Sequence, residues 1–210
     1  MMIHIKICGI TNIKDAISAI EAGADMLGFN FHPPSPRSIS PDVCASITAE
    51  LKKFPIKLVG VFVNMPAPAI IKILQDCRLD IAQLHGDEKP QDLALIHGRS
   101  FKAFRGIPNH ETLQSYLKYS NQIDPAFLLD AMATGLYGGS GEQTDWNAAG
   151  ELAKQSNILL AGGLKPDNVI EAVKLVRPWG VDTASGVEIR PGVKDAFKMR
   201  EFVLAARSVV

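Results

Sequence analysis

Eight short runs of apolar and β-branched residues recur along the chain, and helix-length stretches separate most of them. The runs span residues 3–8, 26–31, 57–63, 81–85, 100–104, 126–131, 157–162 and 181–185. Stretches such as PDNVIEAVKLV between them repeat apolar residues at helical spacing. This alternation predicts βαβ units and a parallel sheet. Eight units of roughly 26 residues suit a compact barrel. We therefore expect an α/β fold, a (β/α)8 TIM barrel forming a single domain over residues 1–210, with a smaller doubly wound sheet as the alternative.

The composition argues against several classes of partner. Lys and Arg together number 22, as do Asp and Glu, so no net field attracts nucleic acid or a membrane surface. No apolar run is long enough to cross a bilayer, and the first residues lack a secretory pattern. The three cysteines, without CxxC spacing, suit a reducing compartment. We expect a cytoplasmic protein, a monomer by default, that binds a small molecule.

Residues at helix ends support the same division. Asp167 and Asn168 follow a proline, which favours the first turn of a helix. Asp145 stands just before Trp146, where we expect another helix to begin. Gly23 and Gly98 follow apolar stripes, so we expect both to end helices in the left-handed conformation.

Active sites of such barrels lie at the carboxyl ends of the strands, and Cys8 is placed there. The isoleucines of residues 3–7 share one face of the first strand, whereas Lys6 and Cys8 share the other. The isoleucines can pack against helices, which leaves Cys8 at the mouth of the barrel. A lone cysteine is more often a small buried apolar residue, and that interpretation fits Cys44 and Cys77 on helical stretches.

Asp130 is the second candidate. It is a single carboxylate at the end of the apolar run AFLLDA, and isolated carboxylates are rarely left unpaired in a core. A proton donor is one role for it, and a cap on a loop amide is the other. The glycine-rich segment 132–146 that follows is expected to order substrate or close over it.

Two glycine-containing turns follow the seventh and eighth runs and predict a phosphate site. Gly162 and Gly163 lie in LAGGL, and Ser185 and Gly186 lie in ASGVE. Backbone N–H groups of such turns can converge on an anion, although glycines also simply make turns. Arg37 lies in the proline-rich loop PPSPRSISP, which could aim its guanidinium at a carboxylate.

His85 ends the fourth run, and Asp182 lies in the eighth. We place both beside Arg37 among the substrate-binding candidates. A metal site is not expected, since His32 and His85 show no ligand spacing.

Motifs along the whole chain resemble one family. In order, these are KICGIT, GFNFHPPSPRSI, GVFVN, QLHGDE, LLDA, GGSGEQTDW, LAGGLKPDNV and VDTASGVEIRPGVKD. They are similar to those of the phosphoribosylanthranilate isomerases of tryptophan biosynthesis. Asn30 and Thr144 depart from the family pattern, at positions where a valine and an aromatic residue are common.

The resemblance implies an Amadori rearrangement of a phosphosugar substrate without metal or organic cofactor. On that basis Cys8 matches the general base, Asp130 the general acid and Arg37 the group that meets the anthranilate carboxylate. The AGG and ASG glycines correspond to the phosphate site.

Two alternatives remain open. One is a related phosphosugar isomerase or epimerase, of which the epimerase would need a metal. The other is a non-catalytic barrel that binds a phosphorylated metabolite. Such a barrel would not need both Cys8 and Asp130.

Overall fold

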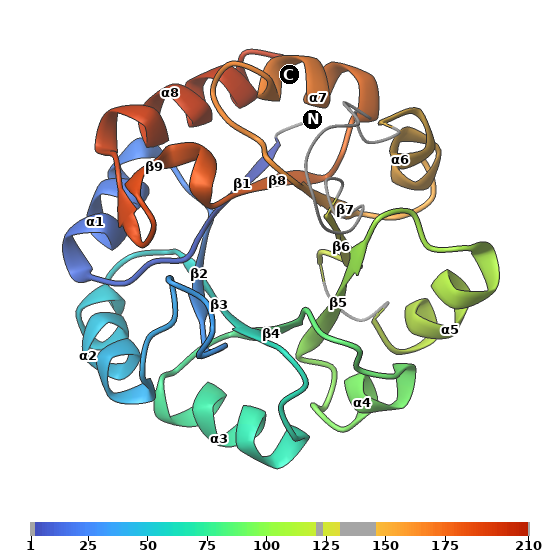
Figure 1. Ribbon diagram of the computed structural model, residues 1–210, viewed down its shortest axis with the longest axis horizontal. Coiled ribbons are helices and arrows are strands. Elements are labelled where there is room, and N and C mark those ends of the chain that lie inside the picture. Colours follow the sequence, from blue (N-terminus) through green and yellow to red (C-terminus); the bar gives the residue numbers. More distant parts are fainter. Residues whose placement is uncertain (1–2, 121–123, 131–145, 210) are drawn as a thin grey trace.

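The computed structural model describes residues 3–120, 124–130 and 146–209. Its main sheet is a closed barrel in which eight parallel strands pair in chain order (Figure 1). The strands are β1 (His4–Cys8), β2 (Met26–Asn30), β3 (Lys57–Phe62), β4 (Ile81–Leu84), β5 (Ser100–Arg105), β6 (Phe127–Asp130), β7 (Ile158–Ala161) and β8 (Gly180–Thr183). Each lies within a residue or two of an expected run, so the (β/α)8 barrel is confirmed.

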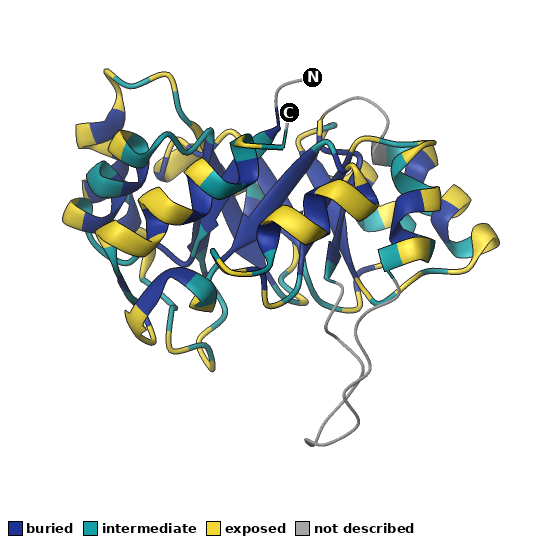
Figure 2. Cartoon of the chain, turned by 90° about the horizontal axis from the view of Figure 1, so that it is seen from above, coloured by how far each residue is buried: buried dark blue, intermediate teal, exposed yellow. Residues whose placement is uncertain are grey.

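Helices surround the barrel. They are α1 (Ile13–Ala22), α2 (Pro41–Leu51), α3 (Ala67–Asp76), α4 (Pro90–Ala94), α5 (His110–Ser120), α6 (Trp146–Ala153), α7 (Val169–Val176) and α8 (Ala196–Arg207). Their buried faces meet the strands, and their exposed faces point outward (Figure 2). No helix in the described ranges is both long and apolar enough to span a membrane.

The side chains of each strand divide between two cores. Ile5 and Ile7 of β1 belong to the large cluster between barrel and helices, as the alternation predicts. A smaller cluster fills the barrel itself, and Leu128 and Leu159 are among its members. Lys6, also inside, is fully buried. The polar face of β1 therefore points toward the barrel axis.

Local signals at the helix ends were partly correct. Gly23 caps α1 with φ of 100°, and Asn168 is the N-cap of α7, both as expected. The prediction for Gly98 was wrong, because α4 is short and its cap is Leu95. Gly98 instead lies in a later turn with φ of 71°. Asp145 falls outside the described residues.

The last part of the chain adds structure that the alternation does not predict. A short 3₁₀ turn, η1 (Ser185–Val187), follows β8 and leads into an antiparallel pair, β9 (Glu188–Arg190) and β10 (Val193–Lys194). Thr11, just after β1, donates a hydrogen bond to the Gly192 carbonyl between these strands at 2.6 Å. This contact places the pair beside the carboxyl end of β1.

Candidate active site

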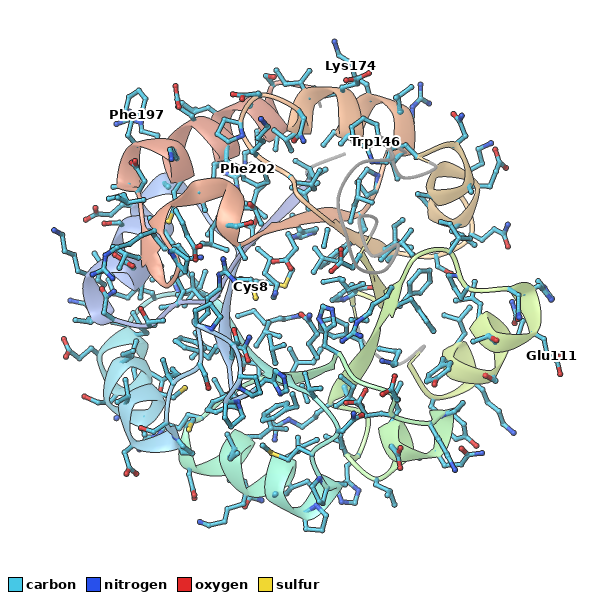
Figure 3. All side chains as sticks on the ribbon, in the orientation of Figure 1. Cys8, Glu111, Trp146, Lys174, Phe197 and Phe202 are labelled. Atoms are coloured by element: carbon cyan, nitrogen blue, oxygen red, sulfur yellow. The ribbon has the colours of Figure 1, made fainter. Side chains whose placement is uncertain are left out.

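A cavity of about 390 Å³ opens at the carboxyl ends of the strands. Eight of the nine predicted site residues line it: Cys8, Arg37, His85, Asp130, Gly162, Gly163, Asp182 and Ser185. Figure 3 shows Cys8 inside the ring of helices, whereas Glu111, Lys174 and Phe197 lie at its outer edge. The residues come from six strands or the loops after them, as is typical of barrel enzymes.

Gly186 is the one predicted residue that does not line the cavity. A Cβ at this position would lie 2.0 Å from the Leu164 carbonyl oxygen, so close packing between loops requires glycine there. The structure thus gives Gly186 a packing role. Gly162 and Gly163, with φ of 98° and 63°, adopt a backbone that favours glycine and forms the cavity wall with Ser185.

Cys8 shares the inner face of β1 with Lys6. The Lys6 ammonium group donates to Asp182 Oδ1 at 3.0 Å, and the two residues are paired in the register of β1 and β8. Burial raises the pKa of the Cys8 thiol, and the positive charge of Lys6 opposes that shift. Burial likewise raises the pKa of Asp182 against the effect of Lys6.

Asp130 ends β6 and reaches the cavity close to His85. His85 Nε2 lies 3.7 Å from Asp130 Oδ2. The other ring nitrogen, Nδ1, lies 2.9 Å from the Gln83 side-chain nitrogen. If that amide donates, His85 carries its proton on Nε2, facing the carboxylate. The Gln83 oxygen is buried without a partner among the described residues, so this side chain has an unused acceptor beside the cavity.

Arg37 is held by the carboxylate of Glu188, a residue that no sequence motif marks as part of the site. Its Nε and Nη2 donate to the two oxygens of Glu188 at 2.8 and 2.7 Å. Lys194 donates to the same carboxylate at 2.9 Å. Despite burial, the hydrogen bonds from these two cations hold the pKa of Glu188 below its usual value. Two cations surround one buried anion, which leaves a net positive charge at this edge of the cavity.

The loop that carries Arg37 is fixed at both ends. The Asn30 side chain accepts from His32 N at 2.8 Å and donates to Ser35 Oγ at 3.2 Å. Asn30 thus makes two hydrogen bonds within the loop that the valine common at this position in the family could not make. The Arg37 side chain crosses the backbone of Gly9, where a Cβ would lie 2.6 Å from Arg37 Cδ. Glycine at this position gives the guanidinium its path to the cavity.

Several expectations lie beyond what the structure describes. Thr144 and residues 131–145 of the glycine-rich segment fall outside it. In the described part of the chain, no three His, Cys, Asp or Glu side chains are grouped so that they could hold a metal ion.

A family model described as N-(5'-phosphoribosyl)anthranilate isomerase matches residues 5–205. A relative of that name from Pelobacter propionicus is 46% identical over 98% of this chain and 96% of its own length. One from Trichlorobacter lovleyi is 45% identical, with both chains covered completely.

Solved structures agree. The phosphoribosyl anthranilate isomerase of Thermotoga maritima matches with a TM-score of 0.86 and 40% identity, over 99% of this chain and 100% of that one. A second structure, of the enzyme in complex with reduced 1-(o-carboxyphenylamino)-1-deoxyribulose 5-phosphate, matches with a TM-score of 0.82 and 36% identity over the same shares. With the barrel, the cavity and full-length similarity in agreement, the chain belongs to the N-(5'-phosphoribosyl)anthranilate isomerase family.

Proposed function

We propose that the protein is the isomerase of tryptophan biosynthesis that converts N-(5'-phosphoribosyl)anthranilate to 1-(2-carboxyphenylamino)-1-deoxyribulose 5-phosphate, with Cys8 as general base and Asp130 as general acid. Family membership supports the reaction. The observation that carries the residue roles is that Cys8 and Asp130, from β1 and β6, line one cavity. The order of strands in the closed barrel separates these two by β7 and β8, so the groups approach a bound sugar from different walls.

The first step is opening of the furanose ring. The ring oxygen must accept a proton as its bond to C1′ breaks, and the anthranilate nitrogen supplies the electrons that form a Schiff base. Asp130, in its acid form, donates that proton. Positioned proton transfer of this kind contributes about 10²–10⁴-fold to a rate.

The second step is removal of the proton from C2′. The Schiff base makes this proton acidic because the electrons left behind delocalise into an enolamine. The Cys8 thiolate accepts the proton, and the enolamine then tautomerises to the ketone of the product. No electrons leave the substrate, so the reaction is an internal rearrangement.

The two anionic ends of the substrate require separate anchors in a protein with no net charge. We place the anthranilate carboxylate against Arg37, whose remaining N–H groups are free of the Glu188 contacts. The phosphate belongs at the wall formed by Gly162, Gly163 and Ser185, where backbone N–H groups can converge on it. The ligand of the related structure, which carries both a carboxylate and a phosphate, supports this arrangement. Fixed ends hold C2′ between acid and base.

The direct test measures loss of anthranilate-type fluorescence when the purified protein meets freshly prepared substrate. We expect rapid loss and formation of the ketose product, unchanged by a chelator. Failure of the protein to convert substrate that it binds would favour a metabolite-binding barrel, and activity abolished by the chelator would favour a metal-dependent epimerase. The cytoplasmic location and the monomeric state expected from the sequence stay predictions.

Arg37→Ala should raise KM by about 10- to 100-fold, the equivalent of about 1.5–3 kcal/mol for hydrogen bonds to a charged group, with a smaller effect on kcat. The arginine binds the end of the substrate remote from the reacting carbons, so it acts mainly on binding. Steady-state kinetics measures both constants. An unchanged KM would remove Arg37 from the carboxylate site.

Glu188→Gln should raise KM in the same direction, because the amide cannot accept from both cations as the carboxylate does. Asp25→Asn is the matched control. Asp25 also pairs with an arginine, Arg207, at 3.3 Å, but it lies just before β2, at the opposite end of the barrel. The control should leave KM unchanged. Equal effects of the two substitutions would indicate general destabilisation and contradict the role of Glu188.

A further inference from the structure

Lys6 is a fully buried cation that the proposed chemistry does not yet use. Burial of an ammonium group inside a barrel is costly unless a counter-charge compensates it. Asp182 supplies one at 3.0 Å. Apolar residues can fill a barrel interior at no such cost, as Leu128 and Leu159 do here. A buried charge pair whose carboxylate lines the cavity therefore points to a functional role.

The geometry brings the ammonium group close to the Cys8 sulfur. Both lie around Gly28 of β2, which is paired with Cys8 in the barrel register. A Cβ built on Gly28 would lie 2.7 Å from Cys8 Sγ and 3.1 Å from Lys6 Nζ. The two atoms thus approach the same point, and glycine leaves the room that both side chains occupy. Gly28→Ala would displace one of them.

The charges around the thiol act in opposite directions. Burial raises the pKa of Cys8, the nearby Lys6 ammonium lowers it, and the Asp182 carboxylate raises it. Lys6 in turn has a raised pKa, since the charges of Asp182 and Cys8 together outweigh its burial. The ammonium group therefore stays protonated beside the sulfur.

Other charged groups face this site from neighbouring elements. Lys194 of β10 lowers the pKa of the thiol, and Arg37 is close enough to interact with its charge. The charge of His85 lowers the pKa of Asp182, and the charge of Asp130 raises it. Of all these groups, Lys6 is the cation with the largest effect on Cys8.

We propose that Lys6 is a positioning residue of the reaction: its buried ammonium group stabilises the Cys8 thiolate, and Asp182 holds that ammonium in place while opposing thiolate formation. This inference rests on the proposed role of Cys8 as the base. When Cys8 takes the proton from C2′, the charge on sulfur is lost and the Lys6–Asp182 pair remains balanced. Asp182 therefore limits how far the thiolate is stabilised, which keeps the sulfur basic enough to accept a proton.

The test measures the alkylation rate of the thiol by iodoacetamide as a function of pH, which requires no substrate. The thiolate attacks the reagent and displaces iodide, so the rate follows the ionised fraction. Cys8→Ser supplies the background, because Cys44 and Cys77 are fully buried. Lys6→Met should slow alkylation at neutral pH by at least about tenfold, since a neighbouring opposite charge favours the ionised form by that much or more. Asp182→Asn should accelerate it.

Lys6→Met leaves a buried carboxylate without its partner and can unfold the protein. The double variant Lys6→Met/Asp182→Asn removes both charges and provides the measurement in that case. It should also alkylate more slowly than the unmodified protein, because it lacks the cation that approaches the same point as the sulfur. Circular dichroism verifies the fold of each variant.

The outcomes separate this inference from the proposed function. Equal pH profiles in folded variants would overturn the role of Lys6, and slower alkylation of Asp182→Asn would overturn the part assigned to Asp182. Neither result depends on turnover. Full activity of Cys8→Ser would instead overturn the proposed base while leaving the measured effect of Lys6 on the thiol intact.

Discussion

Replacement of Cys8 with serine should lower kcat by about 10²–10⁴-fold, the usual contribution of a positioned general base. The serine hydroxyl has nearly the same size as the thiol, so the cavity keeps its shape. The hydroxyl ionises far less readily than a thiol, however. Even the positive charge of the neighbouring Lys6 cannot stabilise an alkoxide enough for it to form near neutral pH. KM should change little, because the proposed anchors of the substrate, Arg37 and the glycine wall, are unaltered.

Cys77→Ser is the matched control for this substitution. Cys77 is a fully buried cysteine at the end of α3, and its thiol donates to the Pro41 carbonyl at 3.3 Å, a bond that a serine hydroxyl can keep. The control should retain kcat, with at most a modest loss of thermal stability. Comparable losses of kcat in both variants would mean that serine disturbs the fold, and near-normal kcat in Cys8→Ser would refute the thiolate mechanism.

Much of the fold could be predicted because two periodicities determine it locally. The side chains of β1 alternate between helix-facing Ile5 and Ile7 and barrel-facing Lys6, and that alternation can be read from the residues alone. Parallel strands also place all their carboxyl ends on one face. Cys8 and Asp130 could therefore be assigned to one cavity although 122 positions separate them.

The partners of the site residues could not be predicted in the same way. Lys6 and Asp182 become neighbours only because β1 pairs with β8 when the barrel closes, a contact across 176 positions. Glu188 reaches Arg37 across 151 positions from a short hairpin outside the repeating units. Residue type and local spacing carry no information about such contacts. Gly186 shows the converse limit: its turn has the expected pattern, but the structure places this glycine in a close packing contact outside the cavity lining.

Asp130→Asn should lower kcat by about 10²–10⁴-fold with little change in KM, because the amide keeps the shape of the side chain but cannot donate the proton that ring opening requires. Single-turnover kinetics should place the loss before product formation. Asp80→Asn is the matched control: Asp80 accepts from Leu58 N at 2.7 Å just before β4, at the end of the barrel opposite the cavity. The control should leave kcat unchanged.

Unchanged kcat in Asp130→Asn would indicate that His85 donates the proton instead. His85 also lines the cavity, and its Nε2 lies 3.7 Å from the Asp130 carboxylate. His85→Gln would then show the loss instead. Because only one of the two substitutions can remove the first proton transfer, the pair identifies the group that opens the ring.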